Sequence, residues 1–243
     1  MDYAGRAWLV ASFAVAACGP SSSSETSDAR VIPDSPNADG SVTPYRHVIA
    51  IDGADDFTSG ETFPTTSAAF AARIAWDDAN LYIGYSGPDL ATTTSDAAQK
   101  WLFVYLDTTA GGEAQSELYR TQRATFPTGF AADYYARYKV DGTFSTLRAA
   151  SGGTWSDSAT TLTTAQAGMF VEIAIPLSAI GATNNLSIVT WMINEKDLAE
   201  GTFAGIYETN FTDGYAANLA LTSYMHADFT SQRVPNDGAN RRP

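Results

Sequence analysis

An alternation of side chains with a period of two residues constrains the fold of this chain more than any other feature. In residues 101–106, aliphatic side chains alternate with aromatic ones. Comparable alternation occurs in 81–85, 131–140 and 169–175, and 186–193 is another strongly β-prone run. Because successive side chains of a strand point to opposite faces, these runs predict strands. No stretch has the 3.6-residue period of a long amphipathic helix.

Turn-forming residues separate the predicted strands. Gly-Gly pairs occur at 111–112 and 152–153, and Asp-Gly pairs occur at 52–53, 141–142 and 213–214. Such pairs are typical of tight turns. Many short strands separated in this way predict an all-β fold with little helix. We expect a two-sheet antiparallel β-sandwich of the jelly-roll or immunoglobulin-like kind.

The two ends of the chain differ in composition from its middle. Residues 1–17 contain an early basic residue and a short apolar stretch ending in small residues, as in a secretory signal peptide. Residues 18–45 are rich in Ser, Pro, Asp and Gly without alternation, which predicts a flexible tether. The folded domain is then expected to span 46–233, followed by a loose tail over 234–243.

Charge and residue content exclude some classes of function. The formal net charge is −13, and no basic stripe of the kind that binds nucleic acid is present. The two histidines, His47 and His226, lie far apart, and the Gly-x-Ser-x-Gly motif of a hydrolase is absent. We therefore expect a protein that is not an enzyme and does not bind nucleic acid.

The single cysteine, Cys18, closes the run Val15-Ala16-Ala17-Cys18. This run resembles the lipobox of bacterial lipoproteins. The resemblance implies that the thiol of Cys18 carries lipid and that the protein is exported to the cell envelope, at the outer membrane or the cell surface. Contact with the membrane would then come from the lipid anchor alone. A secretory signal with a cysteine in this place by chance is the alternative.

Four further segments follow one another in a recognisable order, namely 51–57, 75–85, 101–108 and 171–177. Together they resemble the family 9 carbohydrate-binding modules and the wider superfamily of DOMON domains, over about residues 46–229. The resemblance implies a β-sandwich and a carbohydrate partner. Haem domains also belong to this superfamily.

One strand face has the side chains that a sugar site needs, which are aromatic rings with planar polar groups beside them. If the aliphatic side chains of 101–106 face the core, the aromatic ones point outward together. The predicted carbohydrate site consists of Trp101, Phe103, Tyr105, Tyr135, Arg137, Trp155 and Glu172. Two alternatives stay open: loops cover this face, or both faces of the sheet are buried. Trp155, in a Gly-rich segment, either clamps a sugar or folds back as a lid.

A cluster of carboxylates near the start of the domain is a candidate metal site. Asp52, Asp55 and Asp56 lie within five residues, and oxygen ligands of this kind suit a structural calcium ion. Asp is also a favoured turn residue, so a turn without metal is the alternative.

These features together predict a lipid-anchored, non-catalytic carbohydrate-binding protein of the bacterial cell envelope. The main alternative is an envelope β-sandwich that contacts another protein and has no sugar ligand. A haem-binding DOMON-type protein and a glycoside-active enzyme have less support, since no axial ligand pair and no selected carboxylate pair stands out in the sequence.

Overall fold

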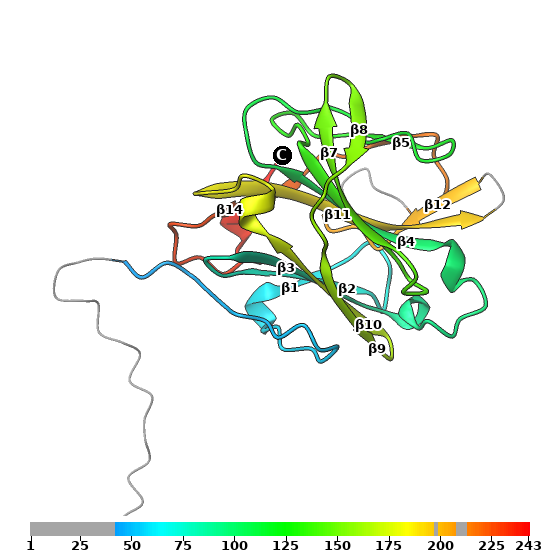
Figure 1. The fold of residues 1–243 in the computed structure, drawn as a ribbon, viewed down its shortest axis with the longest axis horizontal. Helices are drawn as coiled ribbons and strands as arrows, with labels where there is room; N and C mark the ends of the chain where they lie inside the picture. The colour runs from blue at the N-terminus through cyan, green and yellow to red at the C-terminus, as the bar shows by residue number, and fades with distance from the viewer. Residues whose placement is uncertain (1–41, 197–198, 208–212) are drawn as a thin grey trace, which may run out of the picture. The chain divides into compact units, whose positions relative to one another are not determined.

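The computed structural model describes residues 42–196, 199–207 and 213–243, which consist mainly of β-strands (Figure 1). The described residues belong to one compact unit. The helices of the described residues are turns of three residues each, and none is long and apolar enough to cross a membrane. The predicted signal peptide, Cys18 and most of the predicted tether lie outside the described residues.

Two antiparallel sheets make up the domain. The first runs in the order β1 (Thr62–Pro64), β2 (Ala71–Trp76), β3 (Asn80–Ser86), β10 (Phe170–Pro176) and β9 (Thr163–Ala167). The second runs in the order β15 (Arg241–Arg242), β14 (Tyr224–Asp228), β11 (Asn185–Lys196), β4 (Lys100–Asp107), β6 (Tyr134–Lys139), β7 (Ser145–Ser151) and β8 (Thr154–Asp157), and β12 (Ala199–Phe203) also pairs with β11. A short parallel pair joins β5 (Arg123–Thr125) to β13 (Asn218–Ala220).

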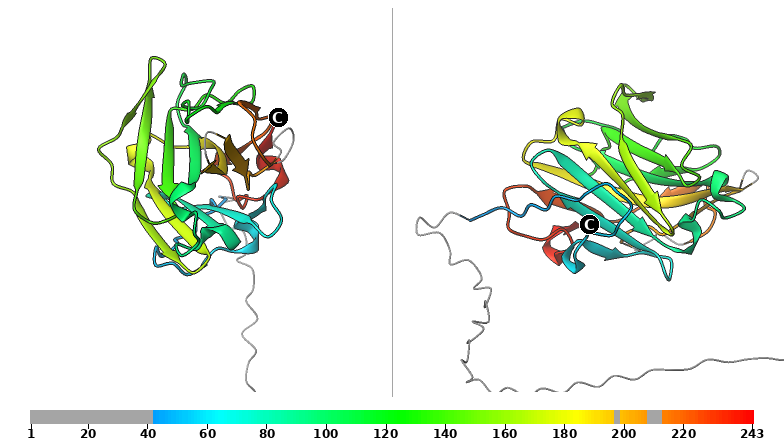
Figure 2. Two further views of the ribbon diagram at one scale, coloured as in Figure 1. Left: turned by 90° about the vertical axis from the view of Figure 1, so that its right-hand side faces the viewer. Right: turned by 60° about the horizontal axis from the view of Figure 1, so that its bottom comes forward.

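The two sheets bury one apolar core between them, as the layers in Figure 2 illustrate. Ile74 on β2 and Ile83 on β3 belong to the same buried cluster as Leu102, Val104 and Leu106 on β4. The period-two alternation therefore places the aliphatic side chains of β4 in the core. The prediction of an antiparallel β-sandwich is confirmed.

A second apolar cluster lies on the opposite face of the second sheet. It contains the aromatic side chains of β4 together with Tyr135 on β6 and Val189 and Trp191 on β11. Phe126 and Leu219, which come from outside that sheet, are buried against them. The second sheet is thus buried on both faces in this region, which was one of the alternatives left open by the sequence.

Both ends of the domain extend further than predicted. Tyr45 packs edge-on against Trp76, with ring centroids 4.9 Å apart, although it was assigned to the tether. Residues 234–243 were expected to be loose, but β15 pairs with β14 as an edge strand. The side chain of Asn240 is buried and donates hydrogen bonds to the carbonyls of Val234 and Pro235. Polar composition suggested a loose tail because these non-local contacts leave no periodic pattern.

Candidate functional site

The three aromatic side chains of β4, which we call the aromatic face, point the same way as predicted. Trp101, Phe103 and Tyr105 share one buried cluster, on the opposite side of the strand from the core. The exposed fractions are only 9% for Trp101 and 2% for each of the other two. The prediction that this face is open to a sugar is therefore wrong, although the three side chains do point away from the core as predicted.

Residues 108–133, which connect β4 to β6, cover the aromatic face. We call them the covering segment, and Figure 1 places its strand β5 on the side of β4 away from β2 and β3. Phe126 packs against Tyr105 with ring centroids 5.1 Å apart. The segment is folded back on itself, since Ser116 Oγ accepts a hydrogen bond from the amide of Ala124 at 2.8 Å. Its apolar side is thereby turned onto the aromatic face and its polar side outward.

Trp155 stands at the edge of this covered region, on the hairpin formed by β7 and β8. The turn consists of Gly152 and Gly153, with φ of 58° and 82°, values that favour glycine and suit a two-residue hairpin turn. Trp155 is half-buried, and its ring lies at 75° to that of Tyr135 and at 83° to that of Tyr105. The two tyrosines thus fix the orientation of the indole, on strand β8 rather than in a loop.

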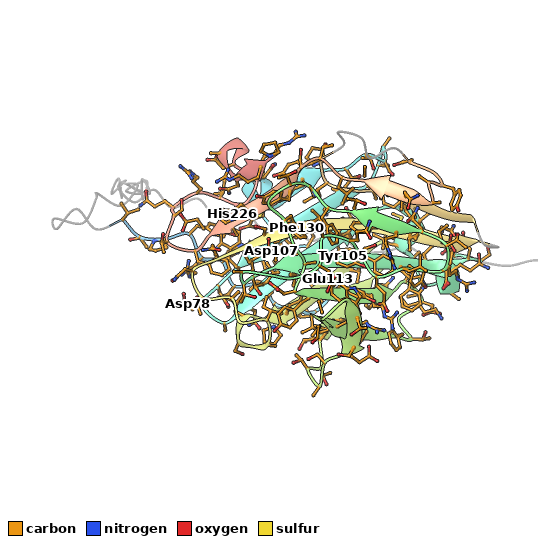
Figure 3. All side chains as sticks on the ribbon, turned by 90° about the horizontal axis from the view of Figure 1, so that it is seen from above. Asp78, Tyr105, Asp107, Glu113, Phe130 and His226 are labelled. Atoms are coloured by element: carbon orange, nitrogen blue, oxygen red, sulfur yellow. The ribbon has the colours of Figure 1, made fainter. Side chains whose placement is uncertain are left out.

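A pocket with a volume of about 370 Å³ opens between the covering segment and the hairpin. Trp155 is its aromatic wall, and the remaining wall is mostly polar. Its lining includes the side chains of Glu113, Gln115, Glu117, Leu118, Arg123 and Trp155. Figure 3 labels Glu113 together with Tyr105 of the aromatic face and Phe130 of the covering segment. Apart from Trp155, none of these six was predicted as a site residue.

Hydrogen bonds fix the position of the pocket's polar side chains. Glu113 accepts a hydrogen bond from the amide of Gly153 at 2.7 Å, which ties the covering segment to the hairpin. The Gln115 amide donates to Thr125 Oγ1 at 3.2 Å. Glu113 and Gln115 themselves form isolated β-bridges, with Ala132 and Thr125 of the same covering segment.

Glu117 is held from two sides. The Tyr135 hydroxyl donates to its carboxylate, and Arg148 Nη2 lies 3.3 Å from it. Burial, together with the nearby Tyr105 and the Glu117 carboxylate, raises the pKa of Tyr135, so its hydroxyl stays a proton donor. The covered aromatic residue Tyr135 therefore positions a pocket carboxylate without entering the pocket itself.

Arg137 lies away from the pocket. Its guanidinium stands over the rings of Trp101 and Phe144, at 5.7 Å and 5.1 Å from their centroids. These are cation–π contacts within the second cluster. The prediction that Arg137 lies beside the aromatic face is borne out, whereas a role in sugar binding would require that face to be open.

Glu172 lies in the other sheet. It is fully buried on β10, where its Oε1 accepts hydrogen bonds from the amides of Asp52 and Gly53, each at 2.5 Å. The prediction that it joins the aromatic face is therefore wrong. Alternation showed that Glu172 leaves the apolar side of its strand, but the sheet to which a strand belongs depends on non-local pairing.

The three aspartates predicted to bind calcium do not converge. Asp55 forms an ion pair with Arg73 at 2.5 Å, and Asp52 accepts a hydrogen bond from the amide of Ala54 within its own turn, while Asp56 is exposed. Across the part of the chain that the structure describes, no group of three or more His, Cys, Asp or Glu residues is placed to hold a metal ion. Turn formation accounts for Asp52, so the predicted calcium site has no set of ligands here.

The missed pocket residues all lie in the covering segment. The sequence after Gly111-Gly112 has no long alternating run, and we assigned no structure to it. A weak signal is present, since Arg123 and Thr125 alternate with Ala124 and Phe126. In the structure Ala124 and Phe126 are buried, while Arg123 lines the pocket.

No family model matches the chain, and no curated protein matches it either. Among solved structures, the chain is similar to a family 9 carbohydrate-binding module from Caldicellulosiruptor kristjanssonii in complex with cellotriose. The sequence identity is 14%, the TM-score is 0.42, and the match covers 73% of this chain and 91% of that chain. Similarity at this level does not extend to a ligand, so the pocket has to be interpreted from its own residues.

Proposed function

We propose that this protein is a non-catalytic carbohydrate-binding protein and that the sugar binds in the pocket beside Trp155. The observation that carries the proposal is the composition of this pocket. An aromatic ring with a fixed orientation stands next to Gln115, Glu117 and Arg123, whose polar groups are planar. A sugar ring presents an apolar C–H face to stack on an indole and hydroxyls around its rim to pair with amide, carboxylate and guanidinium groups.

The size of the pocket suits this ligand. Its volume of about 370 Å³ lies near the lower end of the range of about 300–1,000 Å³ that is typical of small-molecule sites. Glu117 is engaged by Arg148 and by the Tyr135 hydroxyl, an arrangement that favours a hydrogen-bond acceptor over a general acid. Binding without catalysis is therefore the function that we propose.

A glycan-binding assay on the Trp155→Ala variant tests the proposal. The purified protein is screened against a polysaccharide panel, and the affinity for the best ligand is measured by calorimetry. We expect about 10- to 100-fold weaker binding for Trp155→Ala, as for truncation of an aromatic hot spot. Phe144→Ala is the matched control, because Phe144 is 40% exposed and lies outside the pocket.

The outcomes separate this function from its main alternative. If both variants lose the same amount of glycan affinity, or if neither loses any, the pocket is not the binding site. Failure of the unmodified protein to bind any glycan of the panel would favour a sandwich that contacts another protein.

We also propose that the protein is exported and lipid-anchored at the cell envelope. The support is the run Val15-Ala16-Ala17-Cys18 after an apolar stretch. A lipidated N-terminus followed by a polar segment would hold the binding domain at a distance from the membrane surface.

A further inference from the structure

Arg123 forms no ion pair with a carboxylate of the described residues. It lies on β5, is half-buried and lines the pocket. Its Nε is closed off from solvent and has no hydrogen-bond partner. A guanidinium stays protonated in proteins, and it offers five N–H donors and no acceptor. An acceptor that reaches this guanidinium from the pocket would therefore gain a charge-assisted hydrogen bond without displacing a protein partner.

The buried Nε atoms of Arg137 and Arg148 also have no hydrogen-bond partner in the described part of the chain, but each of these guanidiniums has another partner. Arg137 stands over the rings of Trp101 and Phe144. Arg148 reaches Glu117 at 3.3 Å and Asp157 at 3.5 Å, and Arg120 reaches Glu195 at 2.9 Å. Within the described residues, Arg123 forms no such ion pair, although two carboxylates line the same pocket.

Those two pocket carboxylates already have donors. Glu117 forms an ion pair with Arg148 and accepts a hydrogen bond from the Tyr135 hydroxyl. Glu113 accepts a hydrogen bond from the amide of Gly153. The pocket therefore has carboxylate acceptors and, separate from them, an unpaired guanidinium. A ligand that matches both would carry hydroxyl donors and an anionic acceptor.

We infer that the pocket selects glycans that contain a uronic acid, whose carboxylate pairs with Arg123. This inference rests on the proposed function, because it names the class of sugar for the same pocket. A carboxylate accepts two parallel hydrogen bonds from the guanidinium fork and neutralises its charge, whereas a neutral hydroxyl does neither. The hydroxyls of the same sugar donate to Glu113, which fixes the direction in which the ring lies on Trp155.

Most of the net charge of −13 lies outside the pocket, and the two pocket carboxylates, Glu113 and Glu117, each already have a donor. At physiological ionic strength, charges beyond about 8 Å are largely screened. Recognition of the carboxylate is therefore a local contact inside the pocket rather than attraction by the field of the whole protein.

The test compares uronate oligomers with their own methyl esters, in which an O-methyl group replaces the negative charge of the carboxylate. Oligomers of galacturonate, glucuronate and mannuronate are titrated into the unmodified protein and into Arg123→Gln, Arg123→Lys and Arg137→Gln. We expect at least one acid to bind at least about tenfold more tightly than its ester. Arg123→Gln should abolish that preference without lowering the melting temperature, Arg123→Lys should keep part of it, and Arg137→Gln should keep all of it.

Two results would overturn the inference. One is that acids and esters bind equally well, or that neither binds measurably. The other is that the preference for the acid survives in Arg123→Gln. If a neutral glycan of the panel nevertheless binds in a manner that depends on Trp155, the carbohydrate function stands and only the uronate specificity fails. If no glycan binds at all, both fail.

Discussion

Truncation of Phe103 should destabilise the domain strongly, because the aromatic face is a second core. Phe103 is 2% exposed, and its ring lies within 5.1 to 6.4 Å of the rings of Tyr105, Tyr119, Tyr135 and Trp191. The sheet lies on one side of it and the covering segment on the other, so the site cannot readily collapse around a smaller side chain. Replacing a buried Phe by Ala costs about 3–5 kcal/mol.

We expect Phe103→Ala to fall in the upper half of that range, since aromatic pairs add about 0.5–1.5 kcal/mol each beyond area burial. A loss of about 4 kcal/mol would be a large part of a total stability of about 5–15 kcal/mol. The loss is measured by urea unfolding followed by tryptophan fluorescence, as a shift of the midpoint at constant slope.

Leu118→Ala is the matched control for this experiment. Leu118 belongs to the covering segment but is 52% exposed, so its truncation should change stability by less than about 0.5 kcal/mol. A Phe103→Ala protein as stable as Leu118→Ala would refute the reasoning. The covering segment would then not seal the aromatic face in solution, and a sugar site on Trp101, Phe103 and Tyr105 would have to be reconsidered.

Two further predictions concern Glu172 and Cys18. Burial raises the pKa of Glu172 in the folded protein above its ordinary value of 4.5. The folded state therefore binds the proton more tightly than the unfolded state, and stability falls as the pH rises from 4.5 through the raised pKa. Glu172→Gln should flatten this part of a profile of urea stability against pH, and an unchanged slope would mean that other groups cause the pH dependence. Cys18→Ser should release the protein from the membrane into the soluble fraction on cell fractionation, and unchanged membrane association would contradict the lipid anchor.

The sequence predicted what local geometry determines. Alternation along β4 assigned Leu102, Val104 and Leu106 to one side and the aromatic side chains to the other, and the structure has both sets where they were expected. The prediction succeeds because successive side chains of a strand can point only to one or the other side of the sheet. The same logic correctly separated Tyr135 and Arg137 from the apolar side of β6.

Non-local pairing determines the features that the sequence did not predict. The covering segment is held by a bridge between Glu113 and Ala132 and by the pairing of β5 with β13, which lies far along the chain. Glu172 follows the expected alternation but belongs to the sheet of β3 and β9. No local period records which distant segment will lie against a strand face, so exposure could not be deduced from facing.

The covered aromatic face supports the pocket instead of forming it. Tyr105 and Tyr135 stack at 4.6 Å. Both pack edge-on against the ring of Trp155, and the Tyr135 hydroxyl donates a hydrogen bond to Glu117. A binding site gains affinity when its contact groups are already fixed by packing, because less side-chain freedom is lost on binding. Tyr105 and Tyr135, which the sequence marked as ligand contacts, thus lie behind the pocket and fix the orientation of the indole and of the carboxylate that line it.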